Sequence, residues 1–296
     1  MPEAATGGRT SWRTVGSSLL LLGPAFAISA SLLAACLVIL RYSFNAWSPT
    51  GGMVTTWTLE NYVAFLSDSF HYKVLATTLR VSLVTTAVAI VLGYPVAYLL
   101  SVSRRKHLIL FLIILPLLMD VLVRAYGWVV LLSRNGLVNR TLLWTGLLER
   151  PISFLGTETA VVLELLHEVL PFMVLPIASV LERIDPALRE AAIGLGAGPA
   201  TTFRRITLPL SAPGLLAGTL LTFSLAASAF VAPLVLGGGR VPMMSILIQQ
   251  QMTALLNFPA GSAQAIVLVL LVSLLLIGYG RALRLRPAGR ISGGAP

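Results

Sequence analysis

The sequence has a single cysteine, Cys36, and few charged residues. One cysteine excludes an intrachain disulfide. Its setting, "LLAAC", resembles a lipidation box, but the apolar run continues for four more residues and is too long for a signal-peptide core. Charged residues make up only 11% of the chain, hydrophobic residues make up 56%, and the mean hydropathy is +0.88. This composition excludes an ordinary soluble domain and indicates an integral membrane protein.

Patterns typical of catalysis and metal binding are also missing. The glycine-rich stretch "GLGAGPATT" has no lysine before its threonines and follows no predicted strand, so it is not a phosphate-binding loop. In "LHEVLP" a proline stands where a zinc-binding helix would carry its second histidine. No combination of nucleophile, base and orienting group is visible. We therefore expect that the chain is not an enzyme and binds no cofactor or metal ion itself.

Long apolar runs dominate the sequence instead. A hydrocarbon core roughly 30 Å thick requires about 18 or more apolar residues, and in lipid each peptide group must be satisfied within a helix. Six runs are long enough: residues 17–40, 81–100, 108–132, 159–180, 213–236 and 262–280. The sequence therefore predicts an all-α integral membrane protein, with a six-helix domain over residues 17–280 and tails at residues 1–16 and 281–296.

The net charge of +10 follows the topology of these runs, so we expect contact with membrane lipid and no nucleic-acid partner. One side of the predicted bundle carries Arg9, Arg13, Arg104, Arg105, Lys106, Arg183, Arg189, Arg204, Arg205, Arg281, Arg284, Arg286 and Arg290. The opposite side carries only Arg41, Lys73, Arg134, Arg140, Arg150 and Arg240. The positive-inside rule therefore places both tails, and the loop at residues 182–212, in the cytoplasm.

That cytoplasmic loop is far longer than the two to eight residues usual between bundle helices. Asp185 suits an N-cap and Pro186 suits the first helical position, so a short helix should begin there. The glycines and proline of "GLGAGP" should end it in a sharp turn. We expect a second short helix as far as Leu208, before Pro209 and Pro213 reset the chain direction for the fifth span. Such a helical hairpin is suited to docking.

The same stretch resembles the EAA loop of ABC importer permeases. The matching residues, at fixed spacings before the penultimate span, are Glu190, Ala191, Ala192, Gly196, Ile206, Leu208 and Pro209. The resemblance implies a type I ABC importer permease fold, in which this loop is the coupling helix that docks on a cytoplasmic ATPase. It implies that Glu190 pairs with the ATPase and that Gly196 makes the turn. ATP and Mg²⁺ would then be bound by that separate ATPase subunit.

Other stretches resemble the polyamine branch of these permeases, the spermidine and putrescine group. They are "GYPVAYLL", "VRAYGWVVLLSRNGLVN", "LPFMVLPI", "FVAPLVLGGGR" and "NFPAGSAQA". The resemblance implies uptake of polyamines, or of a related small cationic solute, across a bacterial inner membrane. The implied partners are a second homologous permease forming a heterodimer, two ATPase subunits, and an extracytoplasmic binding protein received by the outer loops, including "GGGR". Opines, amino-acid derivatives and phosphonates are alternative solutes.

Ionisable residues inside the predicted spans are candidates for the substrate pathway, because a charge at membrane depth is costly unless it is paired or hydrated. Asp120 and Arg124 lie four residues apart, so we expect them to share a helix face and neutralise each other. Glu164 and Glu168 share a face without a basic partner in their own helix, which suits a cationic solute. The alternative is that either glutamate pairs with Arg124 or with a partner subunit. Candidate aromatic walls for ammonium groups are Tyr126, Trp128, Phe172 and Phe230.

Two other classes of membrane protein remain as alternatives. An ion-coupled secondary carrier could use Glu164 and Glu168 as a proton site, although the docking loop argues against it. A membrane scaffold without transport activity is the other alternative.

Overall fold

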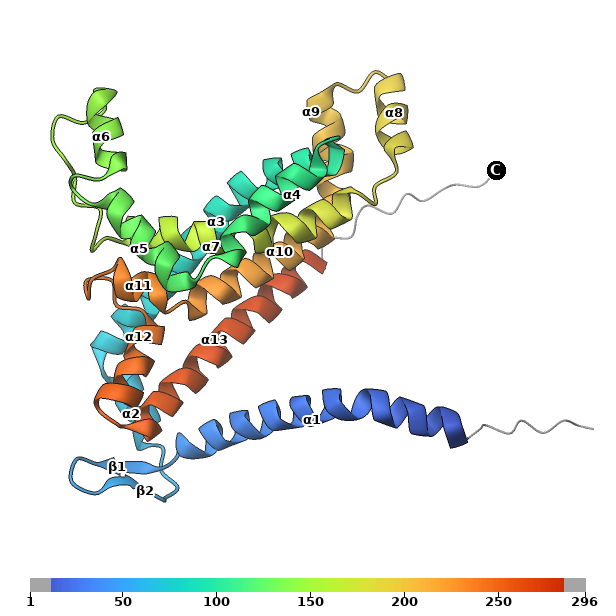
Figure 1. The fold of residues 1–296 in the computed structure, drawn as a ribbon. Helices are drawn as coiled ribbons and strands as arrows, with labels where there is room; N and C mark the ends of the chain where they lie inside the picture. Colours follow the sequence, from blue (N-terminus) through green and yellow to red (C-terminus); the bar gives the residue numbers. More distant parts are fainter. Residues whose placement is uncertain (1–11, 285–296) are drawn as a thin grey trace, which may run out of the picture.

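The computed structural model describes residues 12–284 as a bundle of long helices with smaller elements at two opposite ends (Figure 1). Within these residues, six helical segments are long and apolar enough to cross a membrane, which confirms the predicted all-α, six-span architecture; the third of them, Val121–Trp144, is made of two consecutive shorter helices. The two predicted tails, residues 1–16 and 281–296, fall mostly outside the described residues.

The elements follow one another along the chain, and the longest connection without a helix or strand is residues 145–157. The first ones are α1 (Trp12–Tyr42), the antiparallel hairpin of β1 (Ala46–Ser48) and β2 (Gly52–Val54), α2 (Glu60–Ser67) and α3 (Ser69–Val102). The next ones are α4 (Lys106–Ile114), a 3₁₀ turn (Leu115–Leu118), α5 (Val121–Leu132), α6 (Leu137–Trp144), α7 (Glu158–Leu181) and α8 (Pro186–Gly194). The last ones are α9 (Pro199–Thr202), a π-helical turn (Phe203–Thr207), α10 (Leu208–Ser228), α11 (Val231–Val235), α12 (Met244–Gln249), a second π-helical turn (Gln250–Ala254) and α13 (Phe258–Arg284).

The core of the bundle consists of α3, α7 and α10, each of which packs against the other two. Glycines allow the close approach, as is usual where helices pack in a membrane. A Cβ on Gly93 of α3 would lie 2.9 Å from the Met173 side chain of α7. A Cβ on Gly218 of α10 would lie 2.9 Å from the Met173 backbone oxygen, and one on Gly214 would lie 2.7 Å from the Pro176 oxygen. Helix α7 is therefore held between two glycine-bearing faces.

The predicted third span, residues 108–132, is not one continuous helix, and that prediction is wrong. The helix of α4 and its 3₁₀ turn ends at Leu118, and α5 starts at Val121. Between them Asp120 is the N-cap of α5, where its side chain accepts hydrogen bonds from the backbone of Leu122 and Val123 at 2.9 and 3.3 Å. An N-cap residue has a non-helical backbone, so a helix cannot pass through it.

The fifth span also differs from its predicted range of 213–236. One helical segment runs from Pro199 to Ser228 through the π-helical turn, and the chain breaks before α11 instead. The predicted redirection at Pro209 and Pro213 is therefore wrong. Pro209 lies inside this continuous helical segment, and the π-helical turn directly before it accommodates the hydrogen bond that its missing N–H cannot make.

The first helix, α1, extends away from the other spans (Figure 1). None of its residues from Phe26 to Leu40 is buried, and it meets the remainder of the bundle near the start of α13. The β1–β2 hairpin and α2 lie at that same end, whereas α8 and α9 project from the opposite end (Figure 1).

Candidate functional site

Two glutamates of α7 and one arginine of α5 form an ion cluster. The Arg124 Nε atom lies 3.1 Å from the Glu164 Oε1 atom, and Arg124 Nη2 lies 2.9 Å from Glu168 Oε2. Arg124 also donates from Nη1 to the backbone oxygen of Pro116 at 3.4 Å, and this oxygen accepts from the Met119 backbone N–H as well. The expected neutralisation of Arg124 by Asp120 is therefore wrong, because the aspartate caps α5 and the arginine pairs with α7.

The members of the ion cluster differ sharply in exposure. The side chain of Arg124 is 5% exposed and that of Glu164 is 0% exposed, whereas 32% of the Glu168 side chain is accessible. The second oxygen of Glu164, Oε2, is buried without a hydrogen-bond partner among the described residues. With all three groups ionised, one positive and two negative charges give the cluster a net negative charge, and Glu168 is the member that is accessible on this chain.

A histidine on α7 lies beside the cluster but does not supply the missing positive charge. The Trp128 Nε1 atom donates to the Nδ1 atom of His167 at 3.2 Å, with the two rings edge to face. A ring nitrogen that accepts a hydrogen bond carries no proton, so this imidazole is neutral in the arrangement seen.

The four predicted aromatic walls are not equivalent in the structure. Trp128 lies four residues after Arg124 and shares its helix face, and Phe172 stands in the same relation to Glu168. Tyr126, two residues after Arg124, lies on another face of α5 and is 61% exposed. Phe230 lies half-buried at the break between α10 and α11. Two of the four therefore share a face with the ion cluster.

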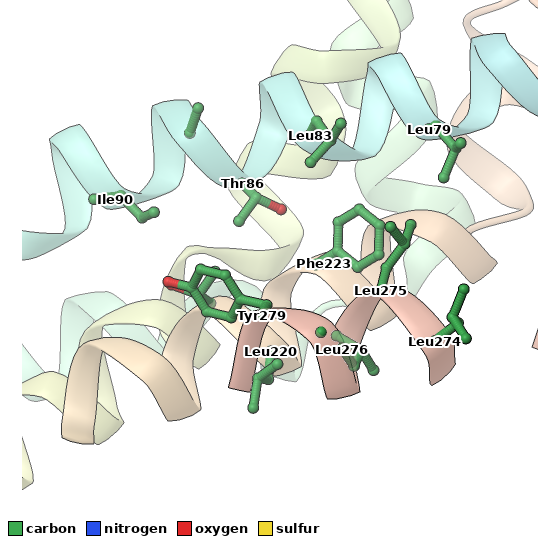
Figure 2. Close-up of a pocket in the computed structure, with 13 residues that line it drawn as sticks. Leu79, Leu83, Thr86, Ile90, Leu220, Phe223, Leu274, Leu275, Leu276 and Tyr279 are labelled. Atoms are coloured by element: carbon green, nitrogen blue, oxygen red, sulfur yellow. The ribbon is translucent and has the colours of Figure 1, made fainter. Parts of the chain in front are cut away.

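The bundle also contains an apolar cavity of about 580 Å³ between α3, α10 and α13. Figure 2 shows leucines from all three helices lining it, with Phe223 on α10 and Tyr279 on α13. The hydroxyls of Thr86 and Thr219 in its wall already donate to backbone oxygens of their own helices. Since no charged group lines this cavity, it is unsuited to recognising a cation, and the ion cluster is the better candidate.

At the other functional region, α8 and α9 form an exposed helical elbow. The Asp185 side chain accepts from the Ala187 backbone at 2.9 Å, and Pro186 occupies the first helical position, which confirms the predicted start of this helix. Gly196 makes the turn with a φ of +83°, a conformation that strongly favours glycine. No residue of α8 is buried, and Leu195 just after it is 89% exposed.

The seven motif residues of the elbow divide by exposure. Glu190, Ala191, Gly196 and Pro209 are exposed, whereas Ala192, Ile206 and Leu208 are partly buried. Leu208 packs against the core cluster formed by α3 and α7. The first helix of the elbow is therefore exposed, while the π-helical turn and the start of α10 that follow α9 pack on the bundle.

Sequence reasoning missed the contacts that join this elbow to α3. The guanidinium of Arg189 lies over the ring of Tyr98, and the hydroxyl of Tyr94 lies 2.7 Å from that of Ser211 on α10. Tyr94 also meets Phe203 of the π-helical turn edge to face, with 5.5 Å between ring centroids. The spacing of Tyr94 and Tyr98 on one helix face was the only signal in the sequence.

Several separate elements lie at the end of the bundle opposite the elbow. They are the β1–β2 hairpin, α6 and the glycine turn before Arg240 (Figure 1). The Arg41 guanidinium lies 4.2 Å from the ring centroid of Trp57, and Trp144 at the end of α6 is 88% exposed. The Asn139 side chain binds the backbone of both Ser133 and Ile152 and so holds the loop after α6 in place.

Comparison with known proteins gives concordant matches. Residues 89–287 match the family described as "Binding-protein-dependent transport system inner membrane component". The chain is 37% identical over 251 residues to the spermidine/putrescine transport system permease protein PotB of Escherichia coli strain K12, covering 84% of this chain and 91% of that protein. It is 30% identical over 277 residues to the inner membrane ABC transporter permease protein YdcU of the same strain, covering 88% of each.

A solved structure shows the same fold. A chain of a bacterial ABC transporter involved in the import of the acidic polysaccharide alginate superimposes with a TM-score of 0.71. The alignment covers 93% of this chain and 99% of that one at 18% sequence identity. At that identity the likeness concerns the fold alone.

Proposed function

The chain belongs to the family of binding-protein-dependent transport system inner membrane components, and we propose that this ABC importer permease takes up polyamines such as spermidine and putrescine. The observation that carries the choice of solute is the 37% identity to PotB over 84% of the chain. The negative ion cluster of Arg124, Glu164 and Glu168 supports it, because polyamines are linear cations. The chain is a multi-pass protein of the inner membrane and is the transport component rather than an enzyme.

We propose that the elbow of α8 and α9 is the surface that docks on the ATPase. Its exposed first helix, which contains Glu190, supports this role, and so does the turn at Gly196 that separates this helix from the segment packed on the bundle. Glu190 would pair with a basic group of the ATPase. Among the other motif residues, Ala191 and Ala192 allow close approach, and Ile206, Leu208 and Pro209 join the elbow to the bundle.

The orientation we propose places the elbow and both chain ends in the cytoplasm. The excess of basic residues around the elbow and the tails supports this orientation. The opposite end, with the hairpin, α6 and Arg240, would then face an extracytoplasmic binding protein. Its exposed tryptophans, Trp57 and Trp144, suit such a contact because tryptophan is enriched in protein interfaces.

We further propose that the assembled importer contains a second, homologous permease and two ATPase subunits, which bind the ATP and Mg²⁺. The pathway for the solute would lie where the two permeases meet, with Glu164, Glu168 and Arg124 on this chain's side. Trp128 and Phe172 would add aromatic faces there, and Asp120, Tyr126 and Phe230 would contribute at its margins. Co-purification of the tagged chain followed by mass measurement of the intact complex tests this composition.

The central experiment is uptake of labelled spermidine into vesicles that contain the whole complex, its binding protein and ATP. Glu190→Ala is expected to lower uptake at least tenfold while the chain still assembles. Glu182→Ala is the matched control, because this exposed glutamate in the same loop makes only a 3.9 Å surface pair with Lys106. Full uptake by Glu190→Ala would show that Glu190 has no role in coupling to the ATPase. If the wild type takes up another solute but no polyamine, the polyamine proposal is wrong, and the assignment as a permease still holds.

A further inference from the structure

The charges of the ion cluster do not balance, and from this we infer that Glu168 recognises one ammonium group of the solute inside the membrane, in exchange for Arg124. The inference rests on the proposed function, because it assumes that the solute is a cation. It adds a specific site and a role for each of three residues. Arg124 is the resident counter-ion, Glu164 holds that counter-ion, and Glu168 is the group that changes partner.

No other charge on the neighbouring helices compensates the cluster. Helix α3 has no charged residue after Arg80, and α10 and α11 have none at all. Arg80 itself pairs with Glu158 at the start of α7. Asp120 is negative and is engaged with the backbone of α5, and His167 accepts from Trp128 and is neutral. The excess negative charge therefore remains with the two glutamates.

The depth of Glu168 makes this excess charge significant. Glu168 lies ten residues after the start of α7, which at about 1.5 Å per residue places it about 15 Å along the helix. That is roughly half of a hydrocarbon core about 30 Å thick. A charge there is costly unless water or an opposite charge reaches it, and such residues usually face an aqueous path. Glu168 is the partly exposed member of the cluster, so the path passes beside it.

The two buried members explain how a cation can bind there and still leave. Arg124 is held by Glu164 Oε1 and by the Pro116 carbonyl, so it stays in place when its contact with Glu168 is lost. It then competes for Glu168 as soon as the ammonium group moves on. Conduction through a site requires binding strong enough for entry and weak enough for exit. A tethered arginine beside the carboxylate meets both requirements.

The decisive variant is Glu168→Gln in the complete complex with its binding protein. It leaves the neutral pair of Arg124 and Glu164 intact, so a purely structural role predicts normal uptake and an unchanged or higher melting temperature. A recognition role predicts at least a tenfold fall in spermidine uptake, while ATP hydrolysis stimulated by the loaded binding protein stays within twofold of the wild type. The control is Glu158→Gln on the same helix, which removes an exposed pair and should leave uptake unchanged.

A second variant, Glu164→Gln, removes the excess charge while keeping Glu168. Arg124 then has Glu168 as its sole carboxylate partner, so uptake is expected to fall here as well. Wild-type uptake by Glu168→Gln overturns the inference. Loss of the assembled complex in that variant also overturns it, because it shows that Glu168 is required for assembly, which is a structural role. If the wild type itself carries no cation, the proposed function fails too, and the wild-type measurement alone distinguishes that case.

Discussion

The guanidinium of Arg189 lies over the aromatic ring of Tyr98, with its central carbon 5.4 Å from the ring centroid. Arg189 precedes Glu190 on α8, and Tyr98 lies in the second-last turn of α3. The contact therefore joins the exposed helix α8, which we propose docks on the ATPase, to one of the three helices that form the core. Movement of α8 on an ATPase would be transmitted to α3 through it.

Replacing Arg189 with alanine should uncouple transport from ATP hydrolysis. A cation–π contact at a partly exposed site is worth about 0.5–1 kcal/mol, so the fold should survive. We expect the amount of solute taken up per ATP hydrolysed to fall severalfold, and Tyr98→Leu should do the same. Arg204→Ala is the matched control, because Arg204 is an exposed arginine of the same connection. An unchanged ratio in both Arg189→Ala and Tyr98→Leu would show that α8 acts without this contact.

Gly196 should be intolerant of any side chain, unlike its neighbour Gly194. Its φ of +83° is left-handed, and a residue with a Cβ pays about 1–2 kcal/mol there. Open space surrounds both glycines, so any penalty comes from the backbone rather than from a clash. We predict that Gly196→Ala displaces α8 and lowers ATP-driven uptake, whereas Gly194→Ala within α8 leaves uptake unchanged. Equal uptake by the two variants would disprove a role for the turn geometry.

Thr78 should contribute more to stability than Thr77, although both hydroxyls donate to the backbone one turn earlier. The buried Thr78 hydroxyl also accepts from the backbone N–H of Met244 at 2.9 Å and so attaches α12 to α3. Thr78→Val leaves that N–H buried and unsatisfied, at a cost of about 1–3 kcal/mol. Thermal unfolding of the purified complex should show a lower melting temperature for Thr78→Val and little change for Thr77→Val. Equal melting temperatures would mean that the Met244 N–H finds another partner.

The break in the third span could have been found from the sequence, because Pro116 and Asp120 are a stop signal and a start signal four residues apart. The apolar run around them obscured both signals. The sequence analysis also predicted that Pro209 would change the direction of the chain, whereas the helical segment continues through it. The π-helical turn directly before Pro209 adjusts the backbone, and the types of its residues do not predict such a turn.

The sequence by itself determined the number of spans, the start of α8 and the turn at Gly196. Each of these depends on local properties: the length of an apolar run, a side chain that caps its own helix, and a φ that glycine alone adopts easily. Only the tertiary structure decided that Arg124 pairs with Glu164 and Glu168 rather than with Asp120, and that Arg189 meets Tyr98. Those partners are separated by 40 or more residues, and the packing of helices brings them within reach.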